Sequence, residues 1–176
     1  MRDTAAGRDR PGARAHFPTW ASFLRSQAGA LLACDFFETV TLSGVRLYVL
    51  AVIEHVSRRI RILGATTHPI ACWVVQAARK LVMDLEDAGS RARFLIRDSD
   101  GKFPGLFDAV LTDAGIEIVL SGVRSPRENA FAERFVGTLR RECLDHVLIL
   151  GERHLRKVLA EFARRYNGHR PHQSLQ

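Results

Sequence analysis

The sequence predicts an α/β fold built on a mixed five-stranded sheet with helices on its faces. Three strand patterns follow one another with short links, at residues 31–37, 45–53 and 58–64. Two later strand patterns, at 94–96 and 116–120, are separated by a short helical pattern. Short links favour antiparallel pairing, whereas a strand–helix–strand crossover favours parallel pairing. We therefore expect three antiparallel strands, followed by strands added in parallel.

Each of the first three strands has its own signal. Residues 31–37 form an apolar run that contains one acidic residue, and 45–53 form a second apolar run after a turn at 41–44. Residues 58–64 alternate polar and apolar side chains, which is typical of a half-buried strand. These three strands are expected to form an antiparallel meander.

Helical spacing of apolar residues predicts four helices. The first begins with Pro69 in its first turn and ends at Gly89. A short helix covers 106–114, between the last two strands, and a final helix covers 152–166. The first helix carries the longest apolar series: Ile70, Trp73, Val74, Ala77, Ala78, Leu81, Val82 and Leu85.

The remaining helix has the clearest start. Ser125 suits the N-cap, Pro126 the first helical position and Glu128 the third, which together form a capping box. One stripe of this helix is apolar, at Phe131, Phe135, Leu139 and Cys143, and another flank is basic, at Arg127, Arg134 and Arg141.

Composition is consistent with one folded domain and an anionic partner. The chain has 176 residues, a net charge of +7 and 47% hydrophobic residues. All its basic residues except Lys80, Lys102 and Lys157 are arginine, which suits bidentate phosphate contacts. A GC-rich genome is an equally good explanation of that bias.

The cysteines and the hydropathy of the chain predict the state of the thiols and the cellular compartment. The three cysteines, Cys34, Cys72 and Cys143, form no CxxC pair and lie in apolar contexts. We expect buried free thiols, no structural zinc and a cytoplasmic protein. No apolar run reaches the roughly 18 residues of a membrane span. Residues 1–17 are expected to be a disordered basic lead-in, and residues 18–176 the folded core.

Three acidic residues are the candidates for chemistry. Asp35 lies inside the first apolar run, Asp98 closes the fourth strand pattern and Glu133 lies in the capped helix. A carboxylate in apolar strand sequence is costly to bury unless something pairs with it. A divalent cation held between carboxylates is the usual pairing in enzymes that cut phosphodiester bonds.

These residues and their surroundings resemble the catalytic cores of bacterial insertion-sequence transposases, within the retroviral-integrase superfamily. The resemblance covers roughly residues 18–176, and thirty-four residues separate Asp98 from Glu133, which is close to the spacing in the family. It is carried by several motifs in family order: 35–37 (DFF), 98–103 (DSDGKF), 125–135 (SPRENAFAERF), 137–143 (GTLRREC) and 166–172 (YNGHRPH).

The resemblance implies a ribonuclease-H-like fold and a metal centre with two Mg²⁺ or Mn²⁺ ions. Asp35 would bridge both ions, while Asp98 would bind one and Glu133 the other. Asp100 is the rival of Asp98, but the phenylalanine five positions after the family's aspartate falls at Phe103 and favours Asp98. For Asp35 the alternative is a strand-end carboxylate satisfied by backbone donors. For Glu133 the alternatives are Glu128, which is better explained as the capping residue, and an ordinary solvated helix position.

The resemblance also implies contacts with double-stranded DNA. Arg140 lies two turns after Glu133 on the same helical face, and Asn129 lies one turn before it. The basic flank of Arg127, Arg134 and Arg141 is a further candidate. Solvated helix charges are the alternative for the arginines, and packing is the alternative for Tyr166, Asn167 and the Arg170-Pro171-His172 signature.

The leading hypothesis is a transposase that cleaves and joins mobile-element DNA ends. An inactive fragment that only binds DNA or a partner, and a nuclease that only hydrolyses, are the alternatives. Family members carry a helix-turn-helix domain before the core and run further after it, so we expect this core to be truncated at both ends. Its partners would be DNA and a second copy or a companion subunit that supplies the helix-turn-helix.

Overall fold

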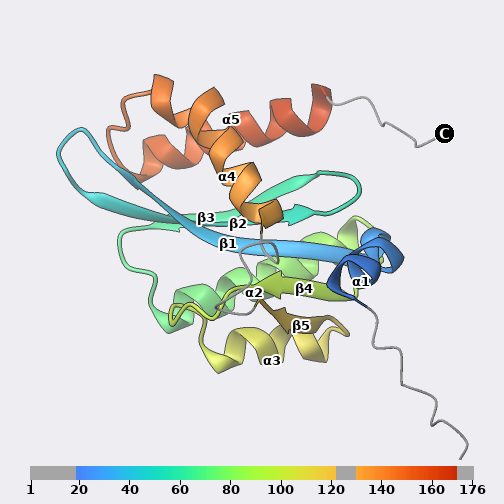
Figure 1. Cartoon of the computed structure of the whole chain (residues 1–176). Helices are drawn as coiled ribbons and strands as arrows, with labels where there is room; N and C mark the ends of the chain where they lie inside the picture. Colours follow the sequence, from blue (N-terminus) through green and yellow to red (C-terminus); the bar gives the residue numbers. More distant parts are fainter. Residues whose placement is uncertain (1–18, 122–129, 170–176) are drawn as a thin grey trace, which may run out of the picture.

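One sheet, in the strand order β3-β2-β1-β4-β5, organises the chain (Figure 1). The computed structural model describes residues 19–121 and 130–169. Neighbouring pairs β1–β2 and β2–β3 are antiparallel, and β1–β4 and β4–β5 are parallel, as predicted. The strands are β1 (Leu31–Val40), β2 (Arg46–Glu54), β3 (Ile60–Thr66), β4 (Phe94–Arg97) and β5 (Glu117–Leu120).

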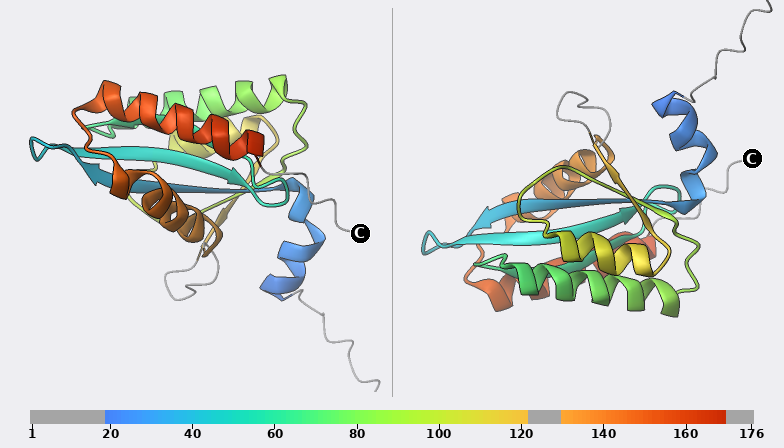
Figure 2. Two further views of the ribbon diagram at one scale, coloured as in Figure 1. Left: turned by 90° about the horizontal axis from the view of Figure 1, so that it is seen from above. Right: turned by 90° about the horizontal axis from the view of Figure 1, so that it is seen from below.

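Helices cover both faces of this sheet (Figure 2). Helices α2 (Ala71–Asp87) and α3 (Gly105–Asp113) lie on one face, and α4 (Ala130–Glu142) and α5 (Glu152–His169) lie on the other. Alternate residues of the central strand β1 therefore enter different cores. Leu32 and Cys34 pack toward α2 and α3, while Ala33 and Phe37 pack toward α4 and α5.

The start of α2 differs from the prediction. The helix begins at Ala71 with Ile70 as its N-cap, so Pro69 lies just before the first turn. Ile70 is 58% exposed and is not part of the buried stripe. The predicted end is confirmed, because Gly89 has φ 60° and the amide of Ser90 bonds to the carbonyl of Leu85 at 2.9 Å.

The prediction of three buried thiols was wrong at one position. Cys34 and Cys143 are buried, but Cys72 is exposed. Cys72 lies on α2, whose buried residues begin at Val74 and Val75, so its position faces away from the sheet. An apolar sequence context did not distinguish the two sides of this helix.

Three short elements were not predicted. Helix α1 (Trp20–Ser26) and the 3₁₀ turns η1 (Ala28–Ala30) and η2 (Leu144–His146) are too short to show a clear period. The final helix also extends past the predicted residue 166 to His169. The predicted capping box and the basic lead-in lie outside the described residues. Within those residues, none of the helices is both long and apolar enough to cross a membrane.

A close approach between β3 and α2 fixes how this helix sits on the sheet. A Cβ added at Gly64 would lie 2.8 Å from Cζ2 of Trp73. The indole also packs near Phe36 of β1, with 6.5 Å between ring centroids. Gly64 thus leaves room for the ring that fills the space beside β1.

We predict that Gly64→Ala destabilises the fold by about 1–3 kcal/mol, because the methyl group overlaps the indole. The same change should cost much less in a Trp73→Leu background. Urea unfolding of the four proteins gives this comparison. Gly105→Ala is the matched control, since no atom lies within 4 Å of the added Cβ. Equal costs of Gly64→Ala in both backgrounds would contradict the proposed overlap.

Candidate metal and DNA site

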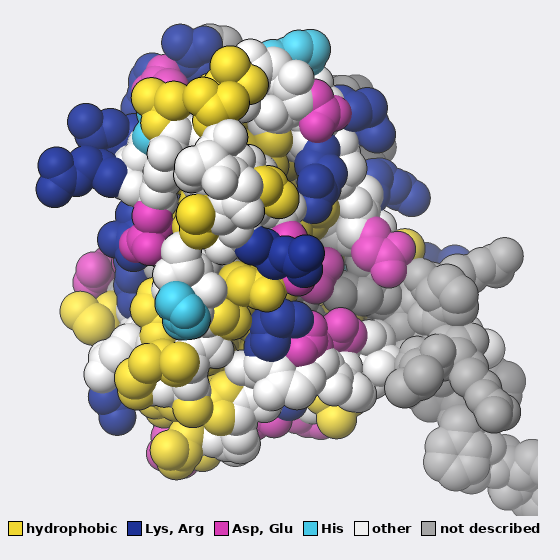
Figure 3. Space-filling model, turned by 90° about the vertical axis from the view of Figure 1, so that its left-hand side faces the viewer, with side chains coloured by type: hydrophobic (Ala, Val, Ile, Leu, Met, Phe, Trp, Pro, Cys, Tyr) yellow, Lys and Arg dark blue, Asp and Glu magenta, His cyan; other side chains and the backbone are white. Residues whose placement is uncertain are grey.

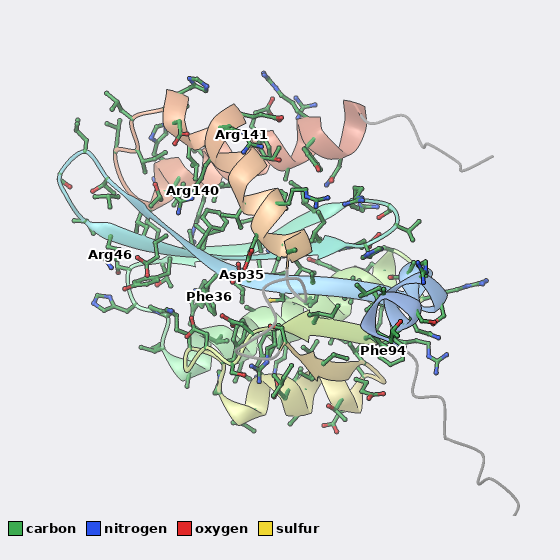
Figure 4. All side chains as sticks on the ribbon, in the orientation of Figure 1. Asp35, Phe36, Arg46, Phe94, Arg140 and Arg141 are labelled. Carbon is green, nitrogen blue, oxygen red and sulfur yellow. The ribbon has the colours of Figure 1, made fainter. Side chains whose placement is uncertain are left out.

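The register of β1 and β4 brings two of the predicted carboxylates together. These strands are parallel, and Ala33 pairs with Ile96. Extending that register by two residues places Asp98, just past the end of β4, level with Asp35. Adjacent strands lie about 4.8 Å apart, so the two backbones are direct neighbours at this level. Figure 4 shows Asp35 in the middle of β1, beneath α4.

The third carboxylate, Glu133, is carried by α4. Ala132, Phe135 and Leu139 of this helix are buried in the core that also contains Ala33 and Phe37. Glu133 follows Ala132 directly and is exposed. Because Asp35 alternates with Leu32 and Cys34, it lies on the α4 side of the sheet. The fold therefore places Glu133 of α4 on the same side of the sheet as Asp35 of β1 and near Asp98 at the end of β4.

Electrostatics at Asp35 records the proximity of these acids. Burial and, next in size, the charge of Asp98 raise the pKa of Asp35 from 3.8 to about 7. Glu133 and Asp100 add smaller repulsions, while the backbone amide of Phe36 acts in the opposite direction. A nearby cation is what would relieve this repulsion.

Asp100, the rival of Asp98, has a different environment. Its carboxylate forms an ion pair with Lys102 Nζ at 2.7 Å and accepts the Lys102 amide hydrogen at 2.8 Å. These bonds lower the pKa of Asp100 against the opposing effect of its burial. Asp98 instead accepts one hydrogen bond, from the Asp100 amide at 3.2 Å. This arrangement favours Asp98 over Asp100 as the carboxylate whose oxygen is available to bind a cation.

Support for Asp98 also comes from a neighbour that the sequence reasoning missed. The buried Arg97 binds both carboxylate oxygens of Asp108, at 3.0 and 2.7 Å, and donates to the Asp98 carbonyl at 2.6 Å. Its guanidinium lies 4.8 Å from the centroid of Phe103. A charged residue at the end of a buried strand requires a partner, and that requirement was the available signal.

The carboxylates fit a hard divalent cation by their chemistry. Mg²⁺ and Mn²⁺ prefer oxygen ligands, and the unrelieved repulsion at Asp35 is of the sign that a cation removes. Among residues 19–121 and 130–169, no three His, Cys, Asp or Glu side chains already form a metal-binding group.

Three of the five residues predicted to contact DNA lie in the described part of the chain. Arg134, Arg140 and Arg141 are exposed on α4, and Arg140 donates from Nη2 to the carbonyl of Glu38 at 2.6 Å (Figure 4). Arg127 and Asn129 lie outside the described residues. Acidic and basic side chains lie side by side across the middle of the face shown in Figure 3.

The described part of the terminal signature has a packing role. The Asn167 side chain bonds to both the amide and the carbonyl of Ile60, each at 2.9 Å, on the edge strand β3. Tyr166 stacks on Phe162 with 5.7 Å between ring centroids. The predicted Arg170-Pro171-His172 segment lies outside the described residues.

Two sequence comparisons find similarity to known proteins over about a third of the chain each. Residues 114–176 match the family model of the integrase core domain. An uncharacterized 39.2 kDa protein of insertion element IS476 from Xanthomonas euvesicatoria is 40% identical over 60 residues. That match covers 34% of this chain and 17% of the insertion-element protein, so it spans a small part of the relative.

Solved structures show the same fold over most of the chain. A chain of the simian T-cell lymphotropic virus intasome, in complex with PP2A regulatory subunit B56 gamma, aligns with a TM-score of 0.56 and 14% identity. It covers 82% of this chain and 56% of the viral one. The HTLV-2 integrase catalytic core domain with magnesium, in its dimeric form, aligns with a TM-score of 0.52 and 10% identity, over 81% and 88% of the two chains.

The raised pKa of Asp35 predicts a pH dependence of stability. The unfolded carboxyl ionises near its ordinary 3.8 and the folded one near 7, so stability is lost as the pH rises between these values. The loss is at most about 4 kcal/mol. Asp35→Asn should abolish it, and the variant should exceed the wild type in stability at pH 8.

Urea unfolding in EDTA at pH 4–8 measures this difference. Asp113→Asn, a change at an exposed carboxylate at the end of α3, is the control and should follow the wild type. Parallel pH profiles for the wild type and Asp35→Asn would mean that Asp35 carries no unrelieved repulsion.

The fold comparison and the sequence match both indicate a relationship to integrase cores, the first over most of the chain and the second over residues 114–176. The ribonuclease-H-like sheet, with three antiparallel strands and two parallel additions, is the fold of the retroviral integrase cores. The family match adds the segment that includes α4 and α5. Residues 114–176 therefore match the integrase core domain, 60 residues of the chain are similar to part of an insertion-element protein, and the chain as a whole has the fold of retroviral integrase catalytic cores.

Proposed function

We propose that this chain is the catalytic core of a transposase that cleaves and joins mobile-element DNA ends with divalent metal ions. The observation that carries the proposal is the convergence of Asp35, Asp98 and Glu133 on one side of β1. The family match supports DNA integration as the setting, and the HTLV-2 integrase core, which was solved with magnesium, supports the choice of metal.

The proposed ligands are the three carboxylates. Asp35, on the central strand, would be shared by two ions, with Asp98 and Glu133 each holding one. When bound, Mg²⁺ or Mn²⁺ lowers the pKa of an attacking water or 3′-hydroxyl and neutralises charge on the phosphate. The chain itself holds the carboxylates on a rigid sheet and on a helix packed against it, so their separation is set by the fold.

DNA is the proposed partner on the α4 side. Arg134, Arg140 and Arg141 are exposed on the helix that carries Glu133, and Arg127 and Asn129 would extend the same contact. Arginine suits phosphate recognition, and such contacts supply affinity without sequence specificity. The viral neighbours are an intasome and a dimeric core, which supports a proposed oligomer or a companion subunit.

A non-catalytic DNA-binding or partner-binding module is the second candidate. The net charge of +7 and the exposed arginines of α4 favour it, because they attract DNA without any metal. A labelled duplex with a free 3′-hydroxyl, incubated with supercoiled plasmid and Mn²⁺, distinguishes the possibilities. Joined product supports the transposase, nicking without joining supports a hydrolytic nuclease, and neither product supports the module.

We predict that Mn²⁺ at ten times its dissociation constant stabilises the wild type by about 1.4 kcal/mol. For a domain of this size, the melting temperature should rise by about 3–6 °C. The shift should disappear in Asp35→Asn, Asp98→Asn and Glu133→Gln, because each variant removes one ligand. Differential scanning fluorimetry across a Mn²⁺ series measures it.

Asp113→Asn is the matched control for the metal shift and should retain it in full. A wild type without any shift would move the assignment to the non-catalytic module. A shift that persists in Asp98→Asn alone would transfer the ligand role to Asp100.

We also predict that Arg134→Gln combined with Arg141→Gln weakens DNA binding and its salt dependence together. Each lost phosphate contact lowers the slope of log affinity against log salt by about 1, so the double variant should lose about 2. Fluorescence anisotropy with a labelled duplex at several NaCl concentrations measures the slope. Arg79→Gln with Lys80→Gln, on the opposite face of the sheet, should leave it unchanged.

A further inference from the structure

The loop between β4 and α3 contains an ion pair that the proposed chemistry does not use. We propose that Asp100 and Lys102 form a clamp that positions Asp98 beside Asp35, which makes Lys102 a positioning residue. This inference rests on the proposed metal-dependent function. We call this pair the Asp100–Lys102 clamp.

Hydrogen bonds link the clamp to Asp98 in a short series. The Asp98 Oδ1 atom accepts the Asp100 amide hydrogen at 3.2 Å, and Asp100 Oδ1 accepts the Lys102 amide hydrogen at 2.8 Å. Lys102 Nζ then returns to Asp100 Oδ2 at 2.7 Å. The position of the ammonium group therefore constrains the backbone that bonds to the Asp98 carboxylate.

The same ammonium group joins the loop to the central strands. Lys102 Nζ lies 5.7 Å from the ring centroid of Phe36 on β1 and 5.7 Å from that of Tyr48 on β2. Phe36 directly follows Asp35 in the chain. Next along the loop, Phe103 packs on Phe36 with 5.1 Å between centroids. Lys102 thus connects the loop that carries Asp98 to the strand that carries Asp35.

Two consequences for the carboxylates follow. One Asp98 oxygen is held by an amide hydrogen, which leaves the other oxygen for a cation. Asp100 is ion-paired with Lys102 at 2.7 Å, so its carboxylate is engaged by the clamp, and it repels Asp35 less than Asp98 does. Residues that orient a metal ligand without touching the metal typically change affinity 10- to 100-fold when they are replaced.

The test compares Lys102→Met, Lys102→Arg and Asp100→Asn with the wild type. Mn²⁺ affinity is measured by electron paramagnetic resonance, and hydrogen exchange of the peptide spanning 98–104 is measured in EDTA. Lys102→Met and Asp100→Asn should each weaken Mn²⁺ binding at least about tenfold. Both should speed amide exchange in the loop, but not in α5. Lys102→Arg keeps a cation for the clamp and should restore both properties.

Lys157→Met, which removes an exposed lysine from α5, is the matched control and should match the wild type. Combining Lys102→Met with Asp100→Asn should cost no more than either single change, because both break one pair. Equal Mn²⁺ affinity in the wild type and Lys102→Met would overturn the clamp and leave the metal site standing. A wild type that does not bind Mn²⁺ would overturn the proposed function. Unchanged loop exchange in Lys102→Met would overturn the clamp in either case.

Discussion

Repulsion between carboxylates at the centre of the sheet is the constraint on which the site depends. Asp35 is partly buried in β1, and the charges of Asp98, Glu133 and Asp100 all disfavour its ionised form. A protein that held these acids together only for stability would gain by replacing one of them. A bound cation would offset the repulsion between these carboxylates. The surrounding structure would then serve to preorganise the proposed ligands.

The rest of the fold acts to hold this arrangement. β1 is central, so apolar residues on both of its faces fix it between two cores. Its neighbour β4 ends where the Arg97–Asp108 pair and the Asp100–Lys102 clamp begin. Arg140 ties α4 to the carbonyl of Glu38 on β1. Asp35 thus lies on the central strand itself, and the elements that carry Asp98 and Glu133 each contact that strand.

Much of the fold could be predicted because its signals are local. Apolar runs predicted the five strands, and link lengths predicted their pairing directions. Gly89 predicted where α2 ends. The errors at Pro69 and Cys72 arose because sequence shows that a helix exists better than where it starts or which side is covered. Helix α1, with seven residues, carries too few turns for a periodic pattern.

The site was predictable only in part. Asp35, Asp98 and Glu133 were proposed from charge in apolar sequence and from family motifs, and the fold places Asp98 and Glu133 close enough to affect the pKa of Asp35. The partners of Asp98 could not, since the contacts of Arg97 with Asp108 and of Lys102 with two aromatic rings depend on how the loop after β4 folds back on the sheet. For the same reason, the sequence favoured Asp98 over Asp100 only through the position of Phe103, and the ion pair between Asp100 and Lys102 could not be foreseen.

Carbon-13 NMR titration of the Asp35 carboxyl, with and without Mg²⁺, tests the central claim most directly. In EDTA we expect a midpoint at about pH 7, because burial and neighbouring carboxylates disfavour the ion. With Mg²⁺ the midpoint should fall well below that value, since the cation stabilises the ionised form. An ordinary midpoint in EDTA, or a raised midpoint that Mg²⁺ does not move, would contradict the account.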